Sequence, residues 1–299
     1  MIRFVDEAEV RARLRMEDLI PAMERALVEF SAGRAVQPLR QVLPVREHGG
    51  FMGVMPARVG GGLGAKLVTF YPPNAARGLP THAALVVVFR PETGEPEAVL
   101  DGRLITEMRT AAVSAVATKL LSRPDAGVLA ILGSGVQARS HLEALRLVRR
   151  IREVRVWSRT PAHALRFAGQ TGARATGSAE EAAIGADVIV TATSATSPVL
   201  CGAWLKRGAH VNAVGACRPD WRELDDDAMR GGVLYVDSRE AALKESGDVI
   251  LSRAPIFAEL GEAVSGAKPA RAGETTVFKS LGMAVEDVAA ARLVLVPHF

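Results

Sequence analysis

A glycine-rich segment in the middle of the chain has the residue types and spacing of a dinucleotide-binding turn. Gly133, Gly135 and Ala138 form a G-x-G-x-x-A pattern that follows the apolar run 128–132 and opens a helical pattern. In such a motif the first glycine allows the tight turn, the second lets the backbone approach a pyrophosphate, and the small third residue permits close helix–strand packing. Free N–H groups at the helix N-terminus would stabilise the phosphates. The spacing therefore predicts a dinucleotide site; the alternative is an ordinary tight turn.

The residues after the next expected strand, 154–157, indicate which dinucleotide is bound. Ser158, Arg159 and Thr160 stand where an NAD enzyme usually carries a carboxylate for the ribose 2′-hydroxyl. Two hydroxyls and a guanidinium suit a 2′-phosphate instead, because they form charge-assisted hydrogen bonds with it. This segment predicts NADP(H); the alternative is that Arg159 is a solvated surface residue.

Three cations in the first part of the chain are candidates for binding an anionic substrate. Arg40 and Lys66 lie in strand-like segments that are otherwise apolar, and Arg109 lies in the helix that leads toward the glycine motif. A cation on an apolar strand should face a cleft or an anion, because burying it unpaired is costly. The alternative for each is a surface position or an internal salt bridge.

The elements that would position these residues form two different patterns. An amphipathic helix around 19–30 ends at Gly33, and a helix is expected over 104–121. Between them, strands separated by Gly/Pro-rich turns indicate a largely antiparallel sheet; they are expected at 38–45, 50–54, 65–70, 81–89 and 97–100. Beyond residue 128, short apolar strands alternate with helices, which indicates a parallel, doubly wound sheet; these strands are expected at 128–132, 154–157, 187–191, 210–214 and 233–236.

The predicted fold class is therefore α/β with two domains. Residues 122–281 should form a Rossmann-type nucleotide domain, and residues 1–121 with 282–299 an α+β substrate domain. The last helix, near 283–293, is expected to return to the first domain. A chain of 299 residues has the length at which such a division is usual.

Composition excludes several classes of function. The net charge is +4 without a dense basic stripe, so nucleic-acid binding is not expected, and the excess of arginine suits a small anion. No apolar stretch approaches the ~20 residues of a membrane span, and acidic residues stand where a signal-peptide core would lie. We therefore expect a cytoplasmic protein. Two cysteines, and histidines without metal-site spacing, predict no metal; the histidines are His48, His82, His141, His163, His210 and His298.

Longer blocks of sequence resemble the ornithine cyclodeaminase/mu-crystallin family. Arg40, Lys66 and Arg109 each lie in a matching motif: QPLR at 37–40, AKLVTFY at 65–71 and RTAAVSA at 109–115. Blocks typical of the mu-crystallin branch follow at 212–226, 235–238, 241–249, 257–262 and 275–287. The resemblance covers nearly the whole chain.

The resemblance implies a reductase that uses NADPH to reduce the C=N bond of a small cyclic imino acid. Substrates would resemble Δ1-piperidine-2-carboxylate or Δ1-pyrroline-2-carboxylate and give cyclic L-amino acids. It also implies a homodimer built by the first domain, and an iodothyronine-like ligand, since mu-crystallins bind thyroid hormone. Alternatives are an amino-acid dehydrogenase, an ornithine cyclodeaminase-type enzyme, or a protein whose main role is to bind a hormone-like small molecule.

The resemblance also assigns site residues. Arg40, Lys66 and Glu245 would face the substrate, with Arg40 and Arg109 holding its carboxylate and Lys66 near the imine nitrogen. Residues reaching the cofactor would be Thr81, His82, Arg109, Gly133, Ser134, Gly135, Val136, Gln137, Ser158, Arg159, Thr160 and His163, with Thr193, Ser194, Val214 and Ser280 along its nicotinamide half.

One position departs from the cyclodeaminase pattern. Those enzymes carry a catalytic aspartate where this chain has Cys217. A neutral thiol cannot take up a proton as a carboxylate does, so cyclodeamination is not expected. Cys217 is predicted to line the pocket, and the alternative is a nucleophile.

Overall fold

The computed structural model describes residues 2–296, which form two compact units. The first unit comprises residues up to Arg109 and those from Gly282 onward, and the second comprises Thr110–Leu281. His298 lies outside the described residues. Helix α3 (Gly102–Leu121) begins in the first unit and ends in the second, so the division falls inside this helix and not after it. No helix in residues 2–296 is both long enough and apolar enough to span a bilayer.

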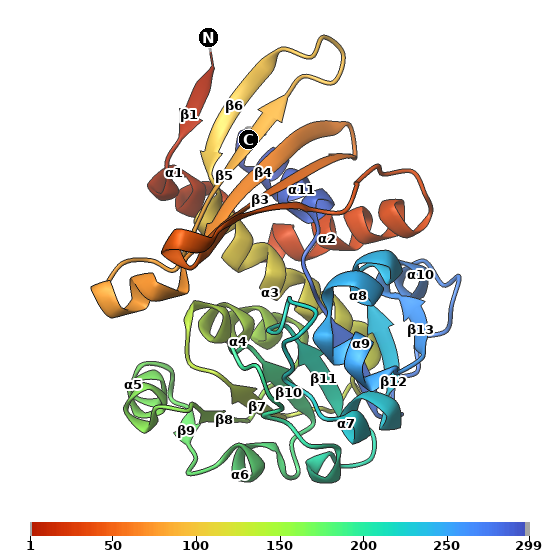
Figure 1. Ribbon diagram of the computed structural model, residues 1–299. Coiled ribbons are helices and arrows are strands. Elements are labelled where there is room, and N and C mark those ends of the chain that lie inside the picture. The colour runs from red at the N-terminus through yellow and green to blue at the C-terminus, as the bar shows by residue number, and fades with distance from the viewer. Residues whose placement is uncertain (1, 297–299) are drawn as a thin grey trace. The chain divides into compact units, whose positions relative to one another are not determined.

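The first unit is built on a six-stranded sheet of order β1-β6-β5-β4-β3-β2 (Figure 1). Neighbouring strands run antiparallel except β1, which pairs parallel with β6, so the prediction of a largely antiparallel sheet is confirmed. The strands are β1 (Arg3–Val5), β2 (Gln41–Val45), β3 (Gly50–Val59), β4 (Gly62–Phe70), β5 (His82–Phe89) and β6 (Pro96–Asp101). Short 3-10 helices, η1 (Arg46–His48) and η2 (Pro72–Arg77), interrupt the meander.

The predicted strands 50–54 and 65–70 are too short, because a run of glycines belongs to the hairpin and not to a loop. Gly60 and Gly61 have φ of 53° and 71° and form its turn. Gly62 and Gly64 are strand residues, and a Cβ on Gly62 would approach Val288 Cγ1 to 2.9 Å. The missing side chains therefore let the last helix pack closely on β4.

Three helices cover one face of this sheet region. They are α1 (Glu7–Arg13), α2 (Met16–Ser31) and α11 (Ala284–Leu295). Helix α11 packs on α2, β3 and β4, so the end of the chain does return to the first unit. Strand β1 and helix α1 were not predicted from the sequence, because both are short. Helix α1 begins at the N-cap Asp6, whose side chain accepts from Glu9 N at 2.9 Å.

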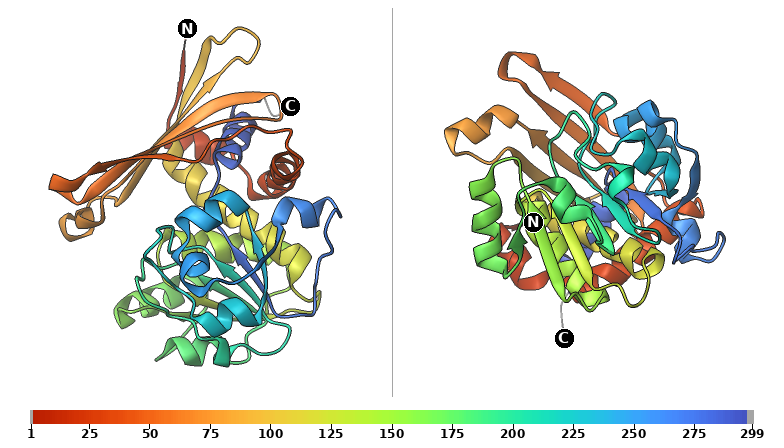
Figure 2. Two further views of the ribbon diagram at one scale, coloured as in Figure 1. Left: turned by 45° about the vertical axis from the view of Figure 1, so that its right-hand side comes forward. Right: turned by 90° about the horizontal axis from the view of Figure 1, so that it is seen from below.

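The second unit is an eight-stranded sheet of order β13-β12-β14-β11-β10-β7-β8-β9, in which every pair is parallel. Helices lie against both faces (Figure 2), and the Rossmann-type prediction is confirmed. The strands are β7 (Val128–Leu132), β8 (Glu153–Trp157), β9 (Arg174–Ala175), β10 (Val188–Thr191), β11 (His210–Ala213), β12 (Val233–Val236), β13 (Ile256–Glu259) and β14 (Thr276–Lys279).

The helices of this unit are α4 (Val136–Val148), α5 (Pro161–Thr171), α6 (Ala179–Ala183), α7 (Asp226–Gly231), α8 (Arg239–Glu245), α9 (Gly247–Ser252) and α10 (Leu260–Val264), with the 3-10 turn η3 (Gly202–Trp204). The strand order reverses between β7 and β10. In open parallel sheets, ligands bind beyond the carboxyl ends of the strands at such a switch point. The fold therefore places the glycine motif, which follows β7, at that edge.

Candidate active site

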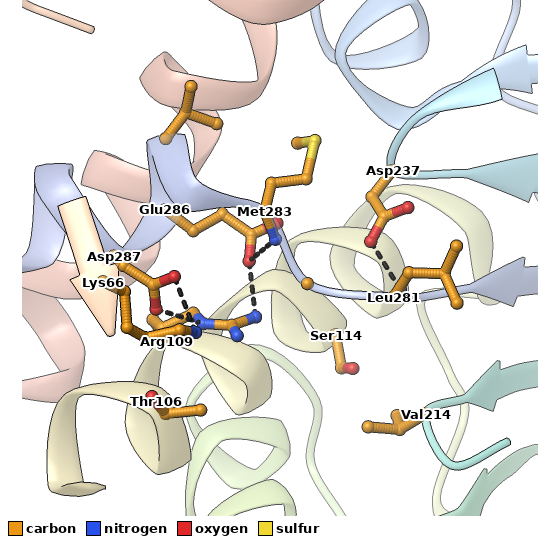
Figure 3. A network of polar contacts seen from close by, with 12 residues as sticks. Lys66, Thr106, Arg109, Ser114, Val214, Asp237, Leu281, Met283, Glu286 and Asp287 are labelled. Carbon is orange, nitrogen blue, oxygen red and sulfur yellow. Dashed lines mark hydrogen bonds and ion pairs between the residues drawn. The ribbon is translucent and has the colours of Figure 1, made fainter. Parts of the chain in front are cut away.

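A buried network of charged side chains lies between β4, α3 and α11 in the first unit (Figure 3). Lys66 Nζ is 2.7 Å from Asp287 Oδ2, and Arg109 Nε donates to Asp287 Oδ1 at 2.9 Å. Arg109 Nη1 donates to Glu286 Oε2 at 2.7 Å. The two cations are 2% and 4% exposed and both acids are fully buried. The charges are therefore compensated by one another and not by water.

The first turn of α11 places both acids of this network. Glu286 Oε2 also accepts from Met283 N at 3.2 Å and so caps the helix. Acidic groups are favoured at a helix N-terminus by the unpaired N–H groups and the dipole. Neither acid was predicted as a site residue from the sequence. The available signal was a pair of adjacent acids at the start of an otherwise apolar helix.

The proton affinity of Lys66 is set by its burial and by the charges of its neighbours. Burial lowers the pKa of Lys66 from 10.5 to about 8; the repulsion of Arg109 and Arg40 adds to this, and the attraction of Asp287 opposes it. Burial alone would raise the pKa of Asp287, but Arg109 and Lys66 hold it below its usual range. Lys66 can therefore lose or regain a proton close to neutral pH while Asp287 stays ionised.

His82 starts β5 and lies opposite Phe70 at the end of β4. Burial and, to a lesser extent, the nearby charges of Lys66 and Arg109 together lower the pKa of His82 to about 4. The imidazole is therefore neutral at physiological pH. Thr81, which precedes it, accepts a backbone hydrogen bond from Tyr71 N at 2.8 Å, so both residues stand at the end of the sheet where β4 ends.

Arg40 does not lie on a strand, and that prediction is wrong. Strand β2 begins at Gln41, one residue after Arg40. Arg40 is half-buried and its Nη2 donates to Gly282 O at 3.0 Å, directly before the turn into α11. Gly282 has φ of 77°, and a Cβ there would overlap the guanidinium of Arg109. The first unit thus brings together Arg40, Lys66, His82 and Arg109.

The glycine motif in the second unit has the shape that a pyrophosphate requires. Gly133 has φ of 122°, and a Cβ there would overlap the carbonyl oxygen of Ala192. At Gly135, the N-cap of α4, no atom of the described chain beyond its two neighbours in sequence lies within 4 Å of the position of a Cβ. Within residues 2–296, Gln137 Oε1 is buried without a hydrogen-bond partner. The open backbone approach fits a pyrophosphate, and the buried amide oxygen fits a dinucleotide only as an acceptor from one of its hydroxyl or N–H groups.

The segment after β8 stands beside this motif. Ser134 Oγ donates to Ser158 Oγ at 3.0 Å, so the two predicted cofactor segments meet. Arg159 and Thr160 are exposed, and so is His163 in the first turn of α5. Thr160 occupies the N-cap position of α5, and Pro161 follows it as the first helical residue. Exposed positions suit both the predicted phosphate contact and the alternative of a solvated surface.

The remaining predicted cofactor residues follow neighbouring strands of the same sheet. Thr193 and Ser194 come after β10, Val214 after β11 and Ser280 after β14. These strands are adjacent and parallel, so their carboxyl ends meet at one edge. Ser280 Oγ is buried, and the side chain is 2% exposed with no hydrogen-bond partner in the described chain.

Two predicted substrate residues also belong to the second unit. Cys217 is exposed and its Sγ lies 3.5 Å from Val214 O, so the thiol stands next to a predicted cofactor contact. Glu245 ends α8 and is half-buried. Among residues 2–296, no group of three or more His, Cys, Asp or Glu side chains is arranged to hold a metal ion.

A parallel Rossmann sheet with a glycine motif at its switch point, joined to a unit with buried cations, defines a nicotinamide-dependent oxidoreductase. The chain belongs to the ornithine cyclodeaminase/mu-crystallin family, whose model matches residues 2–296.

Named relatives agree with this class. The chain is 57% identical to ketimine reductase mu-crystallin of Mus musculus over 97% of this chain and 96% of that protein. It is 39% identical to a Delta(1)-pyrroline-2-carboxylate reductase of Bacillus cereus over 95% and 93%. The structure matches Thermococcus litoralis Delta(1)-pyrroline-2-carboxylate reductase in complex with NADH and L-proline, with TM-score 0.94, 38% identity and coverage of 98% and 96%. It also matches an archaeal alanine dehydrogenase dimer with bound NAD, with TM-score 0.93, 34% identity and coverage of 98% and 94%.

Proposed function

We propose that this chain uses NADPH to reduce the C=N bond of a small cyclic imino acid, giving a cyclic L-amino acid. The observation that carries the proposal is the buried Lys66, whose pKa is lowered to about 8 beside Arg109 and Asp287. A group with a pKa near the working pH is an effective proton donor. A protonated iminium accepts hydride more readily than a neutral imine, so a proton donor next to an anion-binding arginine suits this reaction. The names of the ketimine and pyrroline-2-carboxylate reductases support the substrate class.

Each residue of the first unit has a distinct proposed role. Lys66 keeps the imine nitrogen protonated, and Asp287 orients the ammonium while Arg109 holds Asp287. We assign the main contact with the substrate carboxylate to Arg40, because its planar fork suits bidentate binding. The nicotinamide supplies the hydride when it is bound.

We also propose NADPH as the preferred cofactor and a homodimer as the assembly. The absence of a carboxylate at Ser158, Arg159 and Thr160 supports the cofactor, although two structural relatives contain NADH or NAD. A dimer interface in the first unit is supported by the sheet face opposite to α11. Leu43 and Leu85 lie on that face and are 63% and 47% exposed. Exposed apolar side chains gathered on one face are typical of interaction surfaces.

Steady-state reduction of five- and six-membered cyclic ketimines, with NADPH and NADH in parallel, tests this proposal. We expect turnover with formation of L-proline or L-pipecolate, identified by chiral chromatography. Absence of turnover with either ring and either cofactor would overturn it. Equilibrium binding of an iodothyronine to the same sample tests the alternative of a hormone-like binding protein. Tight binding without any turnover would favour that alternative.

A further inference from the structure

We propose that Glu223, Asp248 and Lys279 are positioning residues that hold the loops after β10 and β11 in the shape required by the nicotinamide half of the cofactor. The proposal rests on the proposed function only in requiring a nicotinamide dinucleotide. None of the three side chains was singled out as a site residue from the sequence. All three are fully buried in the second unit.

Glu223 holds the loop that follows β10. Its Oε1 accepts from both the backbone N and the Oγ1 of Thr193 at 2.6 Å. Its Oε2 accepts from Thr191 Oγ1 at 2.8 Å. Thr193 is one of the predicted nicotinamide contacts, so the carboxylate fixes both the backbone and the side chain of a predicted cofactor residue.

Lys279 holds the loop that follows β11. It is the last residue of β14, and its Nζ donates to the carbonyl oxygen of Gly215, next to the predicted contact Val214. The same Nζ is 3.0 Å from Asp248 Oδ2. Asp248 Oδ1 in turn accepts from the backbone N of Glu223 at 2.8 Å. The three side chains therefore form one continuous connection between the two loops.

The two loops touch with no space between them. A Cβ at Gly215 would overlap the carbonyl oxygen of Thr193 and the carboxyl carbon of Glu223. The next residue, Ala216, has φ of 53°, a left-handed conformation that a side chain disfavours. A strained backbone of this kind persists only where the surroundings hold it, and here the surroundings are the buried carboxylates and ammonium.

An independent observation indicates that a ligand belongs at this edge of the sheet. Ser280, which follows Lys279, is 2% exposed, and its Oγ has no hydrogen-bond partner within residues 2–296. Its backbone is fixed on both sides, because Ser280 N donates to Ala213 O at 3.0 Å and Leu281 N donates to Asp237 Oδ2 at 2.6 Å. A held, buried hydroxyl without a partner is what a carboxamide or ribose hydroxyl would satisfy.

Lys279 keeps its positive charge within this network. Burial would lower the pKa of Lys279, but Asp248, Cys217 and Glu223 raise it above its usual value, so the ammonium stays protonated. Burial raises the pKa of Glu223, against the opposing effect of Lys279. Apolar side chains of similar volume usually stabilise a core as well as a buried ion pair does. We therefore assign these residues to loop geometry and not to stability or proton transfer.

Two variants test the assignment, and neither of them separates the Lys279–Asp248 ion pair. Glu223→Gln keeps the shape of the side chain but removes the negative charge of the carboxylate that accepts from Thr193. The double variant Lys279→Met with Asp248→Asn removes the tie to Gly215, while the new amide oxygen can still accept from the backbone at position 223. Asn212→Ala is the matched control, because it deletes another buried contact, from Nδ2 to Thr118 Oγ1 at 2.8 Å, in the middle of β11.

The readout compares whole and half cofactors. Dissociation constants are measured for NADPH and NADH, and for ADP and adenosine 2′,5′-bisphosphate, which carry only the adenosine half. Thermal melts are recorded on the same samples. Loss of one charge-assisted hydrogen bond should weaken NADPH binding about tenfold in both variants, while the adenosine probes bind as in the wild type. The Asn212→Ala control should lose melting temperature and keep the wild-type ratio of the two affinities.

The positioning role would be overturned if the variants bound the whole cofactors and the adenosine probes more weakly by the same factor. It would also be overturned if variants with a lower melting temperature bound NADPH as the wild type does. Binding of neither NADPH nor NADH to the wild type would overturn it together with the cofactor proposal. If the wild type binds cofactor but reduces no cyclic ketimine, and the variants lose NADPH affinity as expected, the positioning role stands and only the substrate proposal fails.

Discussion

Replacing Lys66 by methionine should remove a proton donor while leaving the fold intact. Methionine keeps the aliphatic bulk, and Asp287 retains its hydrogen bond from Arg109 Nε at 2.9 Å. General acid catalysis contributes typically ~10²–10⁴-fold, so kcat for the ketimine should fall within that range at pH 8. The exposed Lys244→Met, on α8, is the control and should keep wild-type kcat.

The pH dependence gives a sharper signature than the rate alone. The pKa of Lys66 is about 8, so the wild type should keep its donor below that pH and lose it above. The variant depends on protons from solvent, whose supply falls tenfold per pH unit. The ratio of wild-type to variant kcat should therefore rise with pH up to about 8 and then level off.

The free energy of unfolding should depend on pH in the opposite direction to that expected if Lys66 were a structural ion-pair residue. The folded chain releases the Lys66 proton near pH 8 and the unfolded chain near 10.5, so the unfolded state binds more protons within this window. The free energy of unfolding of the wild type should then rise with pH by about 3 kcal/mol relative to the variant. Below pH 8 the charged, buried ammonium is unfavourable by a similar amount, which offsets the lost ion pair with Asp287.

Steady-state kinetics between pH 6 and 10, with urea unfolding on the same samples, tests these expectations. A large loss of stability in Lys66→Met at pH 7, with normal kcat in the folded fraction, would show that Lys66 is only an internal salt bridge. A ratio of wild-type to variant kcat that stays constant across the pH range would exclude proton donation by Lys66.

Three further predictions concern other parts of the site. Arg159→Ala should raise the KM for NADPH and change that for NADH little, and equal losses for both would remove the basis for NADP preference. The unmodified protein, with Cys217 in place of an aspartate, should not release ammonia from ornithine; proline formation from ornithine in a coupled assay would contradict this. Arg40→Met should lower kcat/KM on the order of 10–100-fold, mostly through KM, because a carboxylate is held alike in the ground and transition states. An unchanged KM for the ketimine would exclude Arg40 from the substrate site.

Local signals in the sequence determined the class of fold. The alternation of short apolar strands with helices, and the G-x-G-x-x-A turn after β7, predicted the parallel sheet correctly, because strand period and turn chemistry depend on near neighbours. The same signals failed where one residue type serves two purposes. The glycines at 60–64 predicted a loop, yet two of them form the turn and others are strand residues beneath α11.

The partners of the buried charges were decided only by the tertiary structure. The sequence identified Lys66 and Arg109 as cations needing an anion, but Arg109 and its partner Asp287 are separated by 178 positions in the chain. Likewise Glu223 and Lys279 acquire their role because the parallel sheet brings the ends of β10, β11 and β14 to one edge. Periodicity shows which side chains are buried, whereas the pairing of buried charges depends on which elements pack together. That packing is a property of the whole chain and leaves no local signal.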